Sequence, residues 1–215
     1  MKEYTLYILD FDNTLFDTSG GLKVIMDHAL AAAGLSYDER IFPKIAGRTM
    51  EQIFEITVGD ESKRETFYEH FREIVDSDAY LKGGKPFPET GEVLSELKRR
   101  GKRIAIASGK YRYKIENLLE KYGMLGYPEK IVGYHDTARR KPFPDPILLA
   151  MSGSGVPPEQ TVYVGDSPHD SAAAESAGID SVIVNRHNGL TEDGIKCTFE
   201  ISSLKELLEY GDASV

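Results

Sequence analysis

The sequence predicts an α/β fold with a parallel sheet and an inserted all-helical domain. Short runs rich in Ile and Val alternate along the chain with amphipathic helical patterns. The runs are apolar at nearly every position, as expected for strands that are buried on both faces of a parallel sheet. One long segment, residues 17–85, shows helical patterns and no strand pattern, which indicates an insertion.

Five segments are expected to be strands: 4–9, 103–107, 130–133, 161–164 and 181–184. Between them, helical stripes are expected, as at Ile115, Leu118, Leu119 and Tyr122, whose spacing places them on one helix face. Ile201, Leu204, Leu207 and Leu208 predict a final helix. Strands that alternate with helices in this way favour right-handed crossover connections.

The insertion divides the expected organisation into two domains. Residues 1–16 and 86–215 would form the sheet domain, and residues 17–85 the helical one. Helices are expected over 22–33, 49–56 and 62–75. The turn residues at 19–21 and 83–88 are explained either as hinges of a lid at the two exits or as ordinary surface loops.

Composition narrows the class of protein. The 215 residues are 40% hydrophobic and 28% charged, which excludes a disordered chain, and the formal net charge of −9 argues against a nucleic-acid partner.

Apolar runs reach only five residues, as at 29–33, so no membrane partner is expected. The N-terminus lacks a signal-peptide pattern, so we expect a cytoplasmic protein. The single cysteine, Cys197, excludes an intrachain disulfide, and oligomeric state is not predicted.

Two carboxylates follow the first expected strand directly, at Asp10 and Asp12, with Asn13 and Thr14 next. Open α/β sheets place their ligands at this end of a strand. Neighbouring carboxylates repel one another unless a cation or a shared proton relieves them, and a hard cation such as Mg²⁺ does so with oxygen ligands. An Asx turn between strand and helix explains this short motif about as well.

Three further motifs follow at later positions. Ser108-Gly109-Lys110 ends the second strand and offers a hydroxyl and backbone amides to a phosphate. Lys141 stands before a proline-rich stretch as a potential cation for a phosphate. The fourth strand leads into Gly165-Asp166-Ser167-Pro168-His169-Asp170, which adds two carboxylates. Taken alone, the first of these motifs is explained as well by a helix cap, the second by a surface lysine, and the third by a turn with an N-cap.

Together, in this order and at these strand ends, the four motifs resemble those of the haloacid dehalogenase superfamily of phosphotransferases. The resemblance covers essentially the whole chain and is strongest to its phosphoglycolate phosphatase-like branch. It implies a Rossmann-like core with a helical cap, the cap being the insertion. Asn13 stands where many members have glycine, and asparagine tolerates unusual backbone angles nearly as well.

The resemblance also implies roles. Asp10 would be the nucleophile that forms an aspartyl-phosphate, and Asp12 the general acid and base. Mg²⁺ would be held by Asp10, the Asp12 carbonyl and Asp166, with Asp170 binding directly or in support. The residues expected to hold the phosphoryl group are Asn13, Ser108, Gly109 and Lys141.

The leading hypothesis is therefore a Mg²⁺-dependent phosphatase acting on a small phosphorylated metabolite, of the phosphoglycolate or sugar-phosphate type. Arg48, in the insertion, could contact the substrate anion, although a solvated surface arginine is about as good an explanation. A phosphomutase of the β-phosphoglucomutase type would share every core residue. A non-catalytic binding module is disfavoured because Asp10, Asp12, Lys141 and Asp166 are all present.

Overall fold

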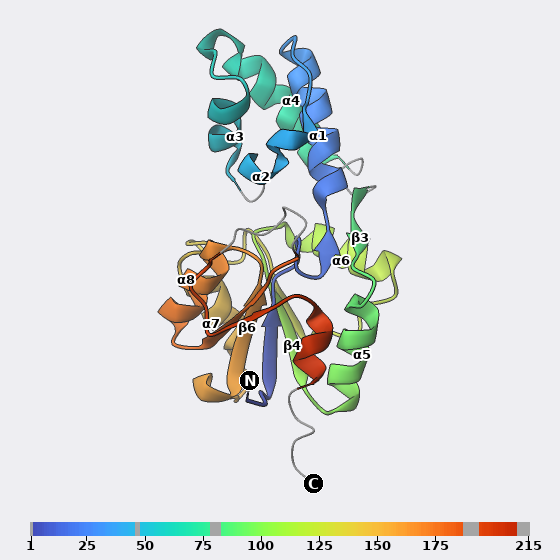
Figure 1. Ribbon diagram of the computed structural model, residues 1–215, viewed down its shortest axis with the longest axis vertical. Coiled ribbons are helices and arrows are strands. Elements are labelled where there is room, and N and C mark those ends of the chain that lie inside the picture. The colour runs from blue at the N-terminus through green and yellow to red at the C-terminus, as the bar shows by residue number, and fades with distance from the viewer. Residues whose placement is uncertain (1, 46–47, 78–82, 187–193, 210–215) are drawn as a thin grey trace. The chain divides into compact units, whose positions relative to one another are not determined.

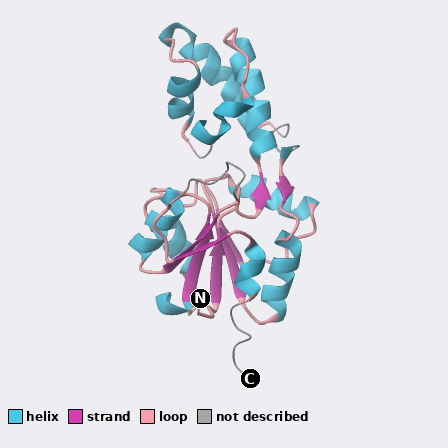
Figure 2. Ribbon diagram, in the orientation of Figure 1, coloured by secondary structure: helices cyan, strands magenta, loops and turns pink. Residues whose placement is uncertain are grey.

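The structure is a computed structural model that describes residues 2–45, 48–77, 83–186 and 194–209 (Figure 1). Contacts within the chain divide it into two compact units, Met1–Phe16 with Pro86–Val215, and Asp17–Lys85. The large sheet belongs to the first unit, and the second unit is built mainly of helices (Figure 2).

A six-stranded parallel sheet forms the centre of the first unit. Its hydrogen-bonded order is β5-β4-β1-β6-β7-β8. The bounds are β1 Leu6–Leu9, β4 Arg103–Ala107, β5 Lys130–Val132, β6 Thr161–Gly165, β7 Asp180–Val184 and β8 Phe199–Ile201. Counted along the chain, these strands run 3-2-1-4-5-6 across the sheet, the order of a Rossmann fold. The expected fold class is confirmed.

Helices cover both faces of this sheet. The helices are α5 Thr90–Arg99, α6 Arg112–Lys121, α7 Asp145–Met151 and α8 Pro168–Ala177, with 3₁₀ turns η4 Pro158–Gln160 and η5 Leu204–Leu208. Figure 1 shows α7 and α8 on one side of the sheet and α5 on the other. Ile8 and Tyr163 pack in one buried cluster with Ile147 of α7 and Ala174 of α8. Because strand side chains alternate between faces, Leu9 faces the opposite layer.

The second unit has its own apolar core. It contains α1 Ser19–Ala32, η1 Glu39–Ile41, α2 Phe42–Ile45, α3 Met50–Thr57, η2 Glu61–Lys63 and α4 Arg64–Asp76. Met26 and Leu30 of α1 pack with Phe54 of α3 and Phe67 of α4, and all four side chains are buried. Thr49 begins α3 with a reciprocal capping box to Gln52. These contacts explain why the segment is helical and compact.

The structure differs from the sequence-based expectation at three places. Residues 19–21 are not a turn but the first turn of α1, where a Cβ on Gly83 would come within 2.4 Å of the Gly20 backbone. Short strands β2 Phe16–Asp17 and β3 Lys85–Pro86 pair with each other. Ile201 belongs to β8, and only 204–208 is helical, as a 3₁₀ turn. Strands of two or three residues have no periodicity to detect and form through pairing with a neighbour.

None of the helices in the described ranges combines the length and the apolar composition needed to cross a bilayer.

Candidate active site

In the first unit, three polar residues that each follow a strand lie at the same edge of the sheet. Strand β1 is hydrogen-bonded between β4 and β6, and all three run parallel. Asp10, Ser108 and Asp166 each follow one of these strands, so they meet at the same edge of the sheet. The strand order reverses at β1, because β4 and β5 lie on one side of it and β6, β7 and β8 on the other. Ligands of open α/β folds bind at such a switch point.

Three buried carboxylates cluster at this edge. Asp10, Asp166 and Asp170 each present an oxygen within 4.8 Å of the others. Their exposed fractions are 6%, 8% and 0%, so solvent screens their repulsion poorly. Asp170 Oδ2 accepts hydrogen bonds from the Ser167 hydroxyl at 2.6 Å and from the Ser167 amide at 3.0 Å. Asp170 is thereby fixed by the first turn of α8, where Ser167 and Asp170 form a capping box.

Lys141 supplies a positive charge inside this cluster. Its Nζ lies 2.9 Å from an Asp10 oxygen and 2.5 Å from an Asp170 oxygen. The same Nζ donates to the Tyr163 hydroxyl at 3.0 Å, and that hydroxyl donates to the Ala107 carbonyl at 2.7 Å. The Lys141-Pro142 peptide bond is cis. The Lys141 ammonium group is thus positioned by Tyr163 of β6 and by the carboxylates of Asp10 and Asp170.

The electrostatic balance of the cluster raises two carboxyl pKa values. Burial, together with Asp170 and Asp12, raises the pKa of Asp10 to about 6 despite the opposing effect of Lys141. Burial and the charges of Asp170 and Asp10 raise the pKa of Asp166 well above its usual range. For Asp170, Lys141 and Ser167 outweigh burial, so its pKa is lowered.

These groups fit a divalent cation. When ionised, the three clustered carboxylates carry three negative charges, and Lys141 offsets one of them. An excess of two negative charges in a buried cluster of oxygen ligands is the donor set that a hard divalent cation prefers. Asp170 already accepts internal hydrogen bonds at both oxygens, which leaves Asp10 and Asp166 as the freer ligands.

Asp12 lies outside the buried cluster. Its side chain is 32% exposed and forms an ion pair with Lys110, whose Nζ lies 2.7 Å from Oδ1. Lys110 is itself buried, with 3% of its side chain exposed. The two carboxylates of the first motif thus have different environments: Asp10 is enclosed, and Asp12 is partly exposed to solvent.

Asn13 adopts a left-handed backbone conformation with φ 57°. Its amide donates to the Phe16 carbonyl at 2.7 Å and closes a tight turn after β1. The turn therefore already uses this amide, and the expected contact of Asn13 with the phosphoryl group stays a prediction. The side-chain Oδ1 is buried and accepts no hydrogen bond from the residues that the structure describes.

Ser108 and Gly109 follow β4 at the same edge of the sheet. Ser108 is buried, and its Oγ accepts a long hydrogen bond, of 3.4 Å, from the Lys110 amide. Gly109 is exposed, and a Cβ built on it would contact nothing within 4 Å, so its backbone is open to a ligand. Both remain available for the predicted phosphate contact.

Comparison with known proteins identifies the family. Residues 7–184 match the family described as haloacid dehalogenase-like hydrolase. The chain belongs to this family. The matched range begins at β1 and ends with β7, so it includes all four motifs and the inserted unit.

Relatives of this haloacid dehalogenase-like hydrolase include proteins named as phosphatases. The pyrophosphatase PpaX of Oceanobacillus iheyensis is 30% identical over 179 residues, which cover 82% of this chain and 81% of that protein. The phosphoglycolate phosphatase of Escherichia coli strain K12 is 28% identical over 201 residues, covering 80% of this chain and 78% of that protein. The expected enzyme class, a phosphatase of this family, is confirmed.

Solved structures agree with this assignment. A haloacid dehalogenase-like hydrolase from Bacteroides fragilis superposes with a TM-score of 0.82 at 31% identity, covering 95% of this chain and all (100%) of that one. A predicted phosphoglycolate phosphatase from Haemophilus somnus has a TM-score of 0.83 at 21% identity, covering 97% and 98%. At that identity the second likeness shows the fold alone.

Arg48, the predicted substrate contact of this hydrolase, lies in the helical unit between α2 and α3. Its side chain is exposed, and Nε donates to the Lys44 carbonyl at 3.2 Å. The neighbouring Gly47 is outside the described residues. The role of Arg48 stays a prediction.

Two site residues of the hydrolase were missed in the sequence. Lys110 belongs to the second motif, and its place just after an expected strand end is the signal that could have identified it; the structure pairs it with Asp12. Tyr163 gave no signal, because a tyrosine in the middle of an apolar run is expected to pack in the core. Only the structure shows that its hydroxyl contacts Lys141.

Proposed function

We propose that this hydrolase is a Mg²⁺-dependent phosphatase that cleaves a small phosphomonoester through an aspartyl-phosphate on Asp10. One observation carries the proposal: at the strand edge, a buried Asp10 lies 2.9 Å from Lys141 inside a carboxylate cluster with an excess of negative charge. A carboxylate in this setting is a nucleophile whose repulsion from a phosphate anion must be offset by cations.

Asp10 and Asp166 would hold Mg²⁺ through side-chain oxygens, and Asp12 through its carbonyl. When bound, the ion supplies positive charge that neutralises the carboxylates and the phosphoryl oxygens. Asp170 contributes by fixing Lys141, because its Oδ1 accepts from Nζ while Oδ2 is bound to the first turn of α8.

In the first step an Asp10 oxygen attacks phosphorus, and the bond from phosphorus to the ester oxygen breaks. Asp12 donates a proton to the departing oxygen, a task for which its partial exposure suits it. Lys141 remains beside Asp10 and offsets negative charge on the phosphoryl group.

In the second step water attacks the phosphorus of the aspartyl-phosphate, and Asp12 accepts a proton from that water. The bond between phosphorus and the Asp10 oxygen breaks, which releases inorganic phosphate and regenerates the carboxylate. The Ser108 hydroxyl and the Gly109 amide would hold the phosphoryl oxygens through both steps, because both groups are open at the same edge.

The unit Asp17–Lys85 is proposed to be the cap that selects the substrate, with Arg48 as a contact for a substrate anion. Its separate apolar core supports a role as an independent body. The relatives are named for two different substrates, pyrophosphate and phosphoglycolate, so the test must include both beside sugar phosphates.

The test is a panel of phosphorylated metabolites assayed for released phosphate and for isomerised product, with Mg²⁺ and with a chelator. We expect Mg²⁺-dependent phosphate release from at least one small phosphomonoester. No turnover across a broad panel would overturn the proposal, and an isomerised sugar phosphate without net phosphate release would identify a phosphomutase instead.

The matched variants are Asp10→Asn and Asp136→Asn. Asp10→Asn should abolish phosphate release and the phosphoenzyme, because an amide cannot form the acyl phosphate. Asp136 makes an ion pair with Arg112 and is not one of the clustered carboxylates, so Asp136→Asn should retain activity. Circular dichroism checks that both variants are folded.

A further inference from the structure

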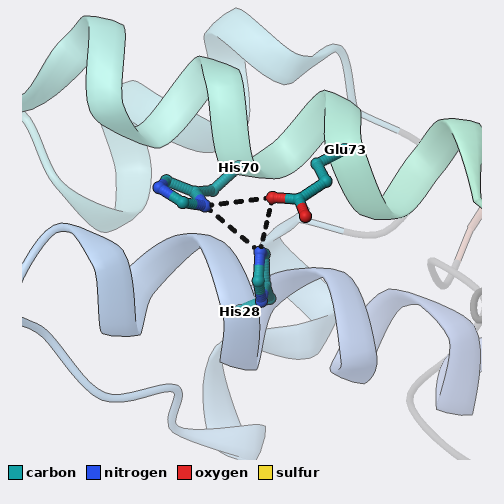
Figure 3. Close-up of side chains that lie close together, drawn as sticks. All are labelled: His28, His70 and Glu73. Carbon is teal, nitrogen blue, oxygen red and sulfur yellow. Dashed lines mark hydrogen bonds and ion pairs between the residues drawn. The ribbon is translucent and has the colours of Figure 1, made fainter.

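A second group of metal-ligating side chains lies in the helical unit. His28 projects from α1, and His70 and Glu73 project from α4, toward a common point (Figure 3). His28 Nε2 lies 3.1 Å from Glu73 Oε2 and 3.2 Å from His70 Nδ1. His70 Nδ1 lies 3.2 Å from the same Glu73 oxygen. Three potential ligand atoms thus form a nearly equilateral triangle.

The local fold explains the convergence. His70 and Glu73 are three residues apart on α4, so they share one face of the helix. Alpha-helices α1 and α4 pack against each other, with Met26 and Leu30 in the same buried cluster as Phe67. The contact between the two helices therefore holds His28 opposite the pair.

Hydrogen bonds alone do not account for the triangle. If only one of the two facing ring nitrogens, His28 Nε2 or His70 Nδ1, carries a proton, it can donate to Glu73 and to the other ring, but the lone pairs of those two acceptors then face each other. If both ring nitrogens carry protons, both can donate to Glu73, but the two N–H groups then oppose each other at 3.2 Å. Each arrangement leaves one repulsive contact, whereas a single cation in the centre satisfies all three atoms.

The spacing fits a tetrahedral transition-metal site. Ligand bonds of about 2.0–2.1 Å at tetrahedral angles place the ligand atoms about 3.3 Å apart. The three observed separations, 3.1, 3.2 and 3.2 Å, lie close to this value. Imidazole nitrogens favour zinc, copper and nickel over magnesium, which prefers oxygen.

We propose that His28, His70 and Glu73 bind one divalent transition metal of the Zn²⁺ class, with water in the fourth position. The side chains are 37%, 34% and 61% exposed, so the metal has access from solvent and room for that water. The ion joins α1 to α4 and stabilises the helical unit. The site is independent of the proposed carboxylate site, which belongs to the other unit.

The decisive experiment is calorimetric titration of the full chain with Zn²⁺ in excess Mg²⁺, which occupies the carboxylate site. We expect one site per chain whose affinity falls at least about tenfold in His28→Gln, His70→Gln or Glu73→Gln. His135→Gln and Glu69→Gln are matched controls, because both residues lie outside the triangle. Their affinity should match the parent protein. Equal Zn²⁺ affinity in all five variants, or no binding by the parent, would overturn the proposal.

A second measurement needs no variant. Nuclear magnetic resonance of the histidine ring nitrogens in the unaltered protein reports which nitrogen binds the metal. On addition of Zn²⁺ we expect His28 Nε2 and His70 Nδ1 to shift, since these atoms form the triangle. Shifts confined to other histidines would place the metal elsewhere and contradict the assignment, even if the variants failed to fold.

Discussion

Each carboxylate of the candidate site has a chemical character set by its immediate surroundings. Asp10 and Asp12 are separated by one residue, yet the first is enclosed with Lys141 and the second pairs with Lys110 and is partly exposed. The difference is consistent with the proposed roles, a nucleophile at the enclosed position and a proton carrier at the partly exposed one.

The role of Asp12 can be tested with the leaving group. Asp12→Asn should slow transfer of the phosphoryl group from an alkyl phosphate to Asp10 by about 10²–10⁴-fold. An aryl phosphate should be affected much less, because its leaving group departs without a proton. The measurement is the burst phase of pre-steady-state kinetics with substrate in excess, since steady-state rates also include the second step.

Ser108→Ala is the matched comparison for this experiment. Its hydroxyl is proposed to contact phosphoryl oxygens that both substrates share, so both bursts should slow by similar factors. Equal losses for the alkyl and the aryl phosphate in Asp12→Asn would remove Asp12 from the role of general acid.

The raised carboxyl pKa values predict how the stability of the metal-free protein depends on pH. The pKa of Asp10 is about 6 in the folded chain against an ordinary 3.8. Between these values the folded state binds more protons than the unfolded state. The contribution of Asp10 to stability is therefore fully present below about 3.8 and is lost as the pH rises through about 6.

Asp166 should add a second loss of this kind, because burial and the charges of Asp170 and Asp10 raise its pKa as well, so removing its carboxylate should recover stability. In chelator at pH 7, Asp166→Asn should raise the free energy of unfolding by about 1 kcal/mol and flatten its fall between pH 4 and 7. Urea unfolding at several pH values measures this, with the exposed Asp27→Asn as control. With Mg²⁺ present the parent should gain more stability than the variant. A less stable Asp166→Asn in chelator would contradict the charge argument.

At the scale of elements, the turn from β6 into α8 sets the position of Asp170. A Cβ built on Gly165 would lie 2.4 Å from Asp170 Cγ, closer than side-chain atoms can approach. Asp170 Oδ2 also accepts from the Asp166 amide at 3.2 Å, so the carboxylate fills the space beside the glycine. Glycine at the end of β6 therefore lets this carboxylate approach the backbone and reach Lys141.

Gly165→Ala should displace Asp170 and with it Lys141. We expect a loss of about 1–3 kcal/mol of stability, as for other overpacked buried sites, together with a large fall in phosphatase activity. Thermal unfolding and phosphate release measure the two effects. Gly126→Ala is the control, because a Cβ there would contact nothing within 4 Å. Unchanged stability and activity in Gly165→Ala would show that the site does not need this close approach.

At the scale of the whole molecule, the chain consists of two units with separate cores. All six strands of the large sheet lie outside the segment 17–85, as far as the described residues show, so the sheet and its helices form without that segment. Folding of the first unit should therefore depend little on the second.

A variant in which a short linker replaces residues 22–82 tests this division. We expect it to retain a cooperative unfolding transition and residual hydrolysis of a small aryl phosphate, but to lose discrimination among metabolites. Thermal unfolding and the substrate panel provide the measurements. An unchanged substrate profile would contradict the proposed role of the helical unit as a cap.

Local patterns were sufficient to predict the α/β class, the insertion and the strand ends that bear Asp10, Ser108 and Asp166. Apolar runs and helical stripes are properties of consecutive residues, and parallel strands necessarily bring their carboxyl ends to one edge. The left-handed conformation of Asn13 also follows from a local preference.

The pairings within the site were decided by tertiary structure. Lys110 and Asp12 are 98 positions apart, and Lys141 reaches Tyr163 across 22. His28 and His70 are 42 positions apart, and only the packing of α1 against α4 brings them together. Such contacts depend on which faces of distant elements pack together, and the local periodicity of the sequence does not determine that packing. The same reason explains β8, which is a strand because β7 pairs with it.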